Sequence, residues 1–148
     1  MIRLMKKEDA PQAAALEKLN FSMPWSERDF ESALEQGNSV YVVCEEQGQI
    51  IGVCGLLISF DEADVLNVSV HPDFRRRGLA REMMLALMQY GKERGVKNFT
   101  LEVRLGNTGA IELYHSLGFC EEGVRPGFYE APKEDALIMW KRERETVC

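Results

Sequence analysis

The sequence has no excess of basic residues and no long apolar run, and both deficits exclude classes of protein. Its 18 Lys and Arg residues face 24 Asp and Glu residues, giving a formal net charge of -6. Proteins that bind nucleic acids are usually basic, and a membrane-spanning helix needs roughly 18 or more consecutive apolar residues. We therefore expect no direct nucleic-acid binding and no membrane span. An acidic surface favours a basic partner.

Cysteine is also scarce, and no pair has the C-x-x-C spacing of a redox or zinc motif. His71 and His115 have no Cys or His partner at metal-binding spacing, so we predict no metal site. Two of the cysteines lie in apolar, strand-like segments and should be buried thiols, and Cys148 should be exposed and without a role. An acidic pair interrupts the first residues, "MIRLMKKEDAP", so they do not resemble a signal peptide. We expect a reduced cytoplasmic protein.

The 148 residues contain no repeat or linker and predict one domain, residues 1–148. Apolar periodicity predicts the order β-α-α-β-β-β-α-β-α-β-β, which is an α/β fold with a mixed sheet. In the first helix, Ala14, Leu16 and Leu19 should face inward. The second helix should begin at Ser26 and end at Gly37, and the third should span Leu79 to Arg94. The strand "KNFTLEVR" should place Phe99, Leu101 and Val103 on one face and Thr100 and Glu102 on the other.

A basic turn opens the third helix in the segment "VHPDFRRRGLA", residues 70–80. A helix N-terminus has unpaired N–H groups and about half a positive charge, which suits a phosphate. Gly78 would let the backbone approach the anion, and Arg75 to Arg77 would add positive charge. The turn matches neither G-x-x-x-x-G-K-[ST] nor G-x-G-x-x-G. Taken alone, it could equally be a solvated surface turn.

Two segments together resemble the GNAT superfamily of N-acetyltransferases. "RRRGLA" fits the acetyl-CoA-binding pattern R/Q-x-x-G-x-G/A, with Ala80 in the last glycine position, and "NTGAIELYHSLGF" is similar to the second signature. The resemblance covers nearly the whole chain. A narrower resemblance is to the RimI type, the ribosomal-protein-alanine N-acetyltransferases, carried by "FSMPWSERDF", "LEVRLGN", "FYE" and "EDALIM". The segment "YEAPKEDA" looks shorter than the RimI-type loop, which bears on peptide selectivity.

The resemblance implies acetyl-CoA as co-substrate and assigns residues to it. Main-chain amides from Arg76 to Arg81 would wrap the diphosphate, and the pantetheine arm would lie along Val68 to Val70 like an added strand. The Val70 amide would polarise the thioester carbonyl. Asn107 would hold the pantetheine, or it would serve only as a helix cap. The implied cofactor-binding residues are Val68, Ser69, Val70, Arg76, Arg77, Gly78, Leu79, Ala80, Arg81 and Asn107.

The same resemblance implies a general base and a general acid. Glu102 would accept the proton of the acceptor amine, and Tyr114 would donate a proton to the departing thiolate. The alternatives are a solvent-facing strand residue for Glu102 and simple helix packing for Tyr114. We hypothesise that Tyr129 helps orient the incoming peptide, although it could equally be a packing aromatic.

Three functions remain open from the sequence. The first is acetylation of the N-terminal alanine of a basic small-subunit ribosomal protein, by a monomer or weak dimer. An α-amine, with a pKa near 7.7–8.0 against about 10.4 for lysine, is far more often neutral at pH 7. The second is acetylation of a small amine, such as a polyamine or an antibiotic, or of other protein N-termini. The third is a non-catalytic acetyl-CoA-binding module, which the presence of both Glu102 and Tyr114 argues against.

Overall fold

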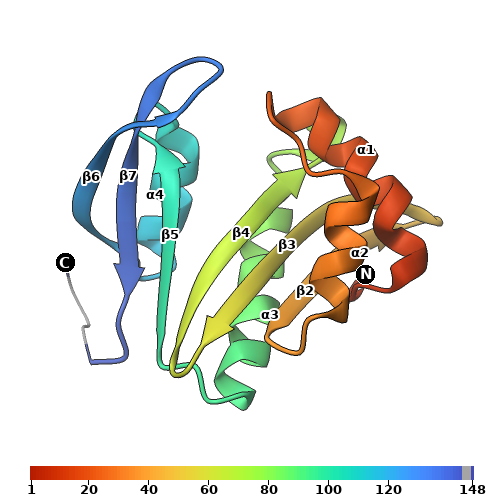
Figure 1. Ribbon diagram of the computed structural model, residues 1–148, viewed down its shortest axis with the longest axis horizontal. Coiled ribbons are helices and arrows are strands. Elements are labelled where there is room, and N and C mark those ends of the chain that lie inside the picture. The colour runs from red at the N-terminus through yellow and green to blue at the C-terminus, as the bar shows by residue number, and fades with distance from the viewer. Residues whose placement is uncertain (145–147) are drawn as a thin grey trace.

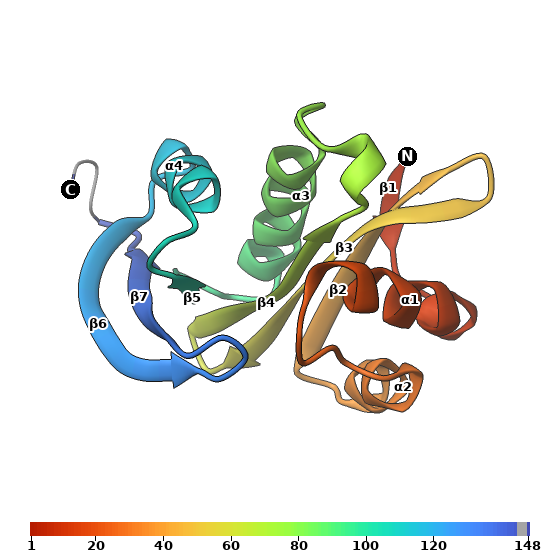
Figure 2. The same cartoon turned by 90° about the horizontal axis from the view of Figure 1, so that it is seen from above.

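A single seven-stranded sheet forms the centre of the protein, with helices on both faces (Figures 1 and 2). The computed structural model describes residues 1–144 and 148. The sheet has the order β1-β2-β3-β4-β5-β7-β6, and the predicted order of helices and strands is confirmed. The strands are β1 (Ile2–Leu4), β2 (Ser39–Glu46), β3 (Gln49–Ser59), β4 (Glu62–Val70), β5 (Asn98–Arg104), β6 (Cys120–Tyr129) and β7 (Glu134–Lys141). The helices are α1 (Ala10–Asn20), α2 (Glu27–Glu35), α3 (Leu79–Glu93) and α4 (Thr108–Ser116), with short 3-10 turns at Lys7–Asp9 and Pro72–Phe74.

Helices α3 and α4 cover one face of the sheet, and α1 and α2 cover the other (Figure 2). The α3 face buries Met83, Met84 and Leu87 against the inward residues of β5, whose alternation is as predicted. The α1 face buries Phe30 of α2 with residues of β2 and β3. Among the described residues, no helix is long and apolar enough to cross a membrane.

The start of the second helix, α2, is set by a local cap. The Ser26 hydroxyl accepts from the Asp29 amide at 3.1 Å, and the Asp29 carboxylate accepts from the Ser26 amide at 2.8 Å, so the predicted cap is a reciprocal capping box.

The prediction that Leu19 of α1 faces inward was wrong, because its side chain is 58% exposed. The buried stripe of α1 runs through Ala10, Ala13, Ala14 and Glu17, and Leu19 falls outside that spacing.

Strands β4 and β5 separate after a short contact, as Figure 1 shows. Among the described strands they are the one parallel pair, and their register covers only Glu62 to Asp64 opposite Asn98 to Thr100. A register shift between β3 and β4 lies beside the separation, and within it Asn67 has a φ of 59°. Beyond Asp64, therefore, one edge of β4 has no partner strand in the described part of the chain. An exposed strand edge is where an extended ligand can bind through main-chain hydrogen bonds.

Cys148 is exposed, as predicted, but the expectations that it has no role and that the cysteines are reduced were wrong. Cys148 forms a disulfide with Cys120 at the start of β6, with 5.2 Å between the two Cα atoms. The pairing joins residues 28 positions apart, which no local spacing could indicate. Cys44 and Cys54 are free and buried, as expected for thiols in core strands.

The α3 face should dominate stability. Phe99 is buried on β5, and its ring lies close to Gly91 of α3. Phe99→Ala should therefore lower the free energy of unfolding by about 3–5 kcal/mol. Phe60, which is 97% exposed, gives the control, because Phe60→Ala should change it by about 0.5 kcal/mol or less. Urea unfolding of both variants checks this, and equal losses would contradict the assignment of the core.

Candidate active site

A groove of about 290 Å³ lies between the basic turn, the first turn of α3 and helix α4. The α4 wall consists of Gly109 and Leu113. The other wall includes several of the predicted cofactor-binding residues, namely Val70, Arg76, Gly78, Leu79, Ala80 and Arg81. The structure therefore places the end of β4 and the N-terminus of α3 around one hollow.

Two residues of the turn that line this groove have a left-handed backbone conformation. Gly78 is the N-cap of α3 with a φ of 75°, and Arg76 has a φ of 65°. Left-handed residues in a turn direct neighbouring N–H groups toward one point, which makes an anion-binding nest. A Cβ on Gly78 would meet no protein atom within 4 Å. The glycine is thus required for its backbone conformation, which L-residues with a side chain adopt at a cost.

The three arginines of the turn have different partners. Arg75 donates to the Asn20 side chain and, at 3.4 Å, to the Val70 carbonyl. Arg77 pairs with Glu46 at 3.5 Å and lies over the Phe74 ring. Arg76 makes no hydrogen bond or ion pair with another described residue. Of the three side chains, Arg76 could therefore contact a bound anion without first breaking an interaction with another described residue.

The end of β4 presents main-chain groups to the open edge. The His71 amide donates to the Ile51 carbonyl at 2.8 Å, so His71 is bonded toward β3. Because successive amides along a strand point to opposite sides, the Val70 amide points away from β3. The Val70 carbonyl accepts from Asn20 at 3.0 Å. The Ser69 side chain is buried and bonded to Asn20, which leaves only its main chain for a ligand. Val68 packs against the α3-side core.

Asn107 acts as the helix cap of α4. Its side-chain oxygen accepts from the Ala110 amide at 3.2 Å. That contact uses the oxygen and satisfies one of the free amides at the start of the helix. Arg81, in the first turn of α3, donates to the Ser116 hydroxyl at 2.8 Å and so connects the two helices that form the groove.

The predicted base, acid and acceptor residue lie around the separation of β4 and β5. Glu102 is on the α1 side of β5, with its side chain 31% exposed, while Tyr114 is buried in the core on the α3 side. Burial raises the pKa of Tyr114, and the nearby Cys54 and Tyr129 add to the effect. Burial also raises the pKa of Tyr129, with Glu102 as the next cause. Tyr129 thus stands among the causes that raise the pKa of Tyr114, and Glu102 among those that raise the pKa of Tyr129.

Tyr129 is the last residue of β6, next to the connection to β7, and contacts from Arg104 and Glu134 hold this region in place. The Arg104 guanidinium lies 4.4 Å from the centroid of the Tyr129 ring and pairs with Glu134 at 3.2 Å. The other Glu134 oxygen accepts from the Gly106 amide at 2.7 Å. These contacts join the end of β5 to the start of β7. They hold the tyrosine ring beside the end of β5.

Comparison with known proteins agrees with this geometry. Residues 10–119 match the acetyltransferase (GNAT) family. The chain belongs to this family of N-acetyltransferases. It is therefore an acyltransferase.

Two relatives and one solved structure are similar over most of this acetyltransferase. The [ribosomal protein bS18]-alanine N-acetyltransferase of Escherichia coli K12 is 36% identical over 141 residues, covering 93% of this chain and 94% of the relative. The enzyme of the same name from Haemophilus ducreyi is 32% identical over 146 residues, covering 94% of this chain and 97% of the relative. The crystal structure of the ribosomal-protein-S18-alanine N-acetyltransferase from Escherichia coli has a TM-score of 0.88 at 32% identity, covering 99% of this chain and 95% of that one.

One buried acidic residue of the acetyltransferase was not found from the sequence. Glu17 of α1 is 2% exposed. Its Oε1 accepts from the Trp25 amide at 3.2 Å and from the Asn67 side chain at 3.1 Å, while Oε2 has no hydrogen-bond partner among the described residues. Asn67 also accepts from the Tyr41 hydroxyl at 2.8 Å. Glu17 thereby connects the α1–α2 loop to the irregular part of β4. A glutamate within an amphipathic helix gives no sequence signal of this kind.

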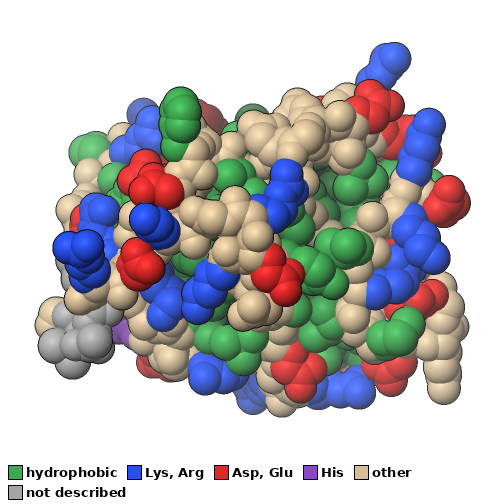
Figure 3. Space-filling view, turned by 90° about the horizontal axis from the view of Figure 1, so that it is seen from below, with side chains coloured by type: hydrophobic (Ala, Val, Ile, Leu, Met, Phe, Trp, Pro, Cys, Tyr) green, Lys and Arg blue, Asp and Glu red, His purple; other side chains and the backbone are tan. Residues whose placement is uncertain are grey.

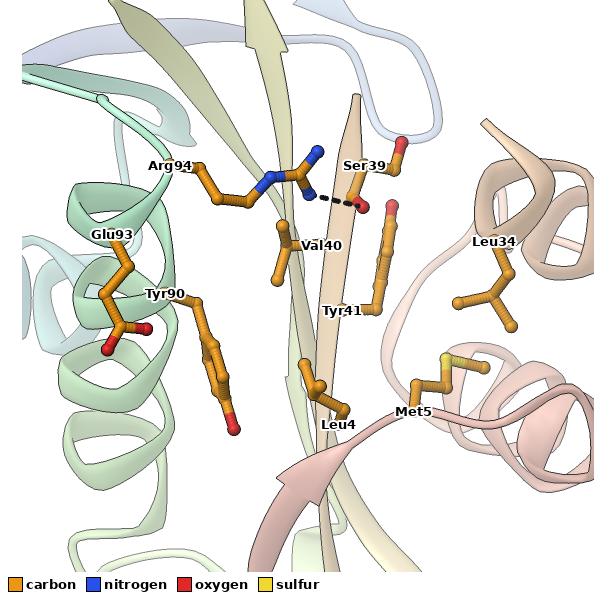
Figure 4. A pocket seen from close by; sticks show the side chains of 9 residues that line it. All are labelled: Leu4, Met5, Leu34, Ser39, Val40, Tyr41, Tyr90, Glu93 and Arg94. Atoms are coloured by element: carbon orange, nitrogen blue, oxygen red, sulfur yellow. Dashed lines mark hydrogen bonds between the residues drawn. The ribbon is translucent and has the colours of Figure 1, made fainter. Parts of the chain in front are cut away.

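A second hollow, of about 270 Å³, lies at the other end of the sheet between α2 and α3 (Figure 4). Leu4, Val40 and Leu34 line it, and Arg94 donates to the Ser39 carbonyl at 3.5 Å across its edge. It contains none of the predicted site residues.

In the face drawn in Figure 3, apolar surface lies toward the centre, and basic and acidic side chains surround it.

No group of three or more potential metal ligands is present in residues 1–144 and 148. The two histidines are engaged locally. The His71 Nδ1 accepts from the Asp73 amide at 3.1 Å, and the His115 Nε2 lies 3.2 Å from Glu121.

Gly78 should matter for both backbone conformation and coenzyme A binding. Gly78→Ala should lower the free energy of unfolding by about 1 kcal/mol, because alanine adopts the left-handed conformation at a cost. Gly95 supplies a matched control, since its φ is 89° and a Cβ added there would also meet nothing within 4 Å. Gly95→Ala should cost similar stability and leave coenzyme A binding unchanged, whereas Gly78→Ala should weaken binding. Thermal unfolding and titration calorimetry distinguish the two, and equal binding by both variants would contradict the site.

Glu17 should make stability depend on pH. Burial raises its pKa in the folded protein, so protonated Glu17 contributes stability that is complete below the unfolded pKa of about 4.3. That contribution is lost as pH rises through the folded pKa. Glu17→Gln keeps an oxygen acceptor but cannot ionise. Relative to the native protein, the variant should therefore be more stable at pH 7 than at pH 4, which means a larger free energy of unfolding. Urea unfolding at both pH values measures this, and a pH-independent difference would refute it.

Proposed function

We propose that this acetyltransferase transfers an acetyl group from acetyl-CoA to the N-terminal alanine of a basic small-subunit ribosomal protein. The observation that carries the proposal is the gap between β4 and β5, with the groove of the basic turn on one side and Glu102 and Tyr129 on the other. The names of the two relatives from Escherichia coli and Haemophilus ducreyi support the acceptor. We place the reaction in the cytoplasm, on a single-domain chain that works as a monomer or weak dimer.

The groove fits coenzyme A by its chemistry. The left-handed residues Arg76 and Gly78 give a nest of main-chain donors at a helix N-terminus, which suits a diphosphate. The Arg76 side chain adds a cation that is not already paired with another described residue. The unpaired edge of β4 from Val68 to Val70 offers main-chain groups to the amides of a pantetheine arm. Acetyl-CoA, when bound, supplies the activated acyl group.

In our proposal, the residues at the gap then move two protons. Glu102 accepts a proton from the acceptor amine, directly or through water, and Tyr114 donates one to the departing sulfur. The raised pKa of Tyr114 keeps its phenol protonated near neutral pH, which is the form that an acid needs. The Val70 amide, directed away from β3, would stabilise negative charge on the acyl oxygen. Exchange with solvent restores both side chains.

The position of Glu102 and Tyr114 on opposite sides of the sheet suits these separate tasks. The acceptor would enter from the α1 side, beside Tyr129. The cofactor would occupy the α3 side, next to Tyr114. An acceptor α-amine, with a pKa of about 7.7–8.0, loses its proton near neutral pH more readily than a lysine side chain does.

The catalytic assignment predicts selective losses of turnover. Glu102→Gln and Tyr114→Phe should each lower kcat by about 10²-fold or more, the range that general acid–base catalysis supplies. Coenzyme A affinity should be retained by both, because neither residue lies in the phosphate groove. Mass spectrometry of a short peptide beginning with Ala measures the transfer. Unchanged turnover in both variants would remove the mechanism while leaving the family assignment intact.

An acceptor panel tests the substrate. The native protein should acetylate the Ala-initiated peptide and should not acetylate the same peptide with a blocked N-terminus and an internal lysine. Spermidine tests the small-amine alternative in the same assay. Faster turnover of spermidine than of any peptide would contradict the proposed acceptor, and tight coenzyme A binding with no transfer to any amine would indicate a non-catalytic module.

A further inference from the structure

The proposed base is engaged by an arginine that the mechanism does not use. Arg125 of β6 donates through the single nitrogen Nη1 to both carboxylate oxygens of Glu102, at 3.1 and 3.0 Å. The Arg125 side chain is 56% exposed. Its guanidinium also lies 4.7 Å from the centroid of the Phe128 ring. One cationic nitrogen thus occupies the position in front of both oxygens of Glu102.

This geometry resembles the way an ammonium group would bind. A guanidinium commonly meets a carboxylate with two parallel N–H···O bonds, whereas here one nitrogen serves both oxygens. An ammonium is likewise a single nitrogen with several donors. The Nη1 atom therefore marks a place where the nitrogen of a protonated acceptor amine would contact Glu102.

The pair is also easy to exchange. Exposed arginine–carboxylate pairs change an equilibrium by about 1.4-fold to 5-fold. The Phe128 ring gives the guanidinium a second contact that does not depend on Glu102. Arg125 can consequently release the carboxylate while its side chain stays on β6.

We propose that Arg125 is a positioning residue that holds Glu102 until the ammonium group of the acceptor takes its place. The idea rests on the proposed function, since it needs Glu102 to face the acceptor. Acceptor binding then exchanges one cation for another, so the charge balance around Glu102 is preserved. Such a site receives the acceptor in its ammonium form, and an α-ammonium, with a pKa of about 7.7–8.0, then gives up its proton more readily than a lysine side chain does.

The test is a steady-state comparison of Arg125→Gln with the native protein, using the Ala-initiated peptide. Removing the competing cation should lower the KM for the peptide by about 1.4-fold to 5-fold, with kcat little changed. Salt gives a second readout. In the native protein one ion pair replaces another, whereas in Arg125→Gln a new pair forms, so the KM of the variant should rise more steeply with ionic strength. Arg125→Lys should behave like the native protein.

Arg142 provides a matched control. It donates through two nitrogens to the two oxygens of Glu122, at 2.8 and 2.6 Å, and lies over the Trp140 ring at 4.3 Å, so it is also an arginine paired with a glutamate beside an aromatic ring, but away from Glu102. Arg142→Gln should leave the KM for the peptide and its salt dependence unchanged.

Two results would overturn the proposal. A large fall in kcat for Arg125→Gln at unchanged or higher KM would mean that Arg125 takes part in the reaction or binds the acceptor. Equal salt dependence in the variant and the native protein would mean that no cation exchange occurs. Failure of the native protein to acetylate or bind the peptide is a different outcome, because it refutes the proposed function itself and the exchange with it.

Discussion

The early separation of β4 from β5 is the constraint on which the site depends. The two strands pair only at Glu62 to Asp64, so the later part of β4 keeps an unsatisfied edge in the middle of a seven-stranded sheet. Unpaired main-chain groups inside a protein are costly unless something binds them. Contacts from α1 and the basic turn satisfy some of them, as at the Val70 carbonyl. The remaining edge is what makes a strand-like ligand suitable here.

Hydrophobic packing keeps the gap open. Helix α3 packs its methionines and Leu87 against β2, β3 and β5, while α4 brings Tyr114 and Leu117 into the same core. On the other face, Glu17 and Asn67 connect the α1–α2 loop to β4. Where it has left β5, strand β4 is thus held from both faces of the sheet, by α3 on one face and by the α1–α2 segment on the other. The disulfide between Cys120 and Cys148 adds a covalent connection at the outer edge of the sheet.

Much of this arrangement could be predicted from local sequence. The order of elements, the cap at Ser26, the alternation of β5 and the turn before α3 all follow from short-range periodicity and turn chemistry. The groove residues near Gly78 were assigned through the resemblance to the GNAT superfamily, because the basic turn alone could equally have been a solvated surface turn. Leu19 was misplaced because a small difference in position around the helix decides whether a side chain faces the core or the solvent.

Other features depend on contacts between distant segments. The Glu17–Asn67 bond joins residues 50 positions apart, and the Arg125–Glu102 pair joins residues 23 apart. Glu17 does not differ from an ordinary surface charge when read along the chain, and the resemblance that pointed to Glu102 gave no sign of its arginine partner.

The central claim is that main-chain donors at the start of α3 bind the diphosphate of coenzyme A while its pantetheine arm lies between β4 and β5. A crystal structure of the complex with coenzyme A tests it most directly. We expect the diphosphate on the amides of Arg76 to Arg81 and the pantetheine beside Val68 to Val70. Phosphates bound elsewhere, or a pantetheine arm outside the gap, would contradict it.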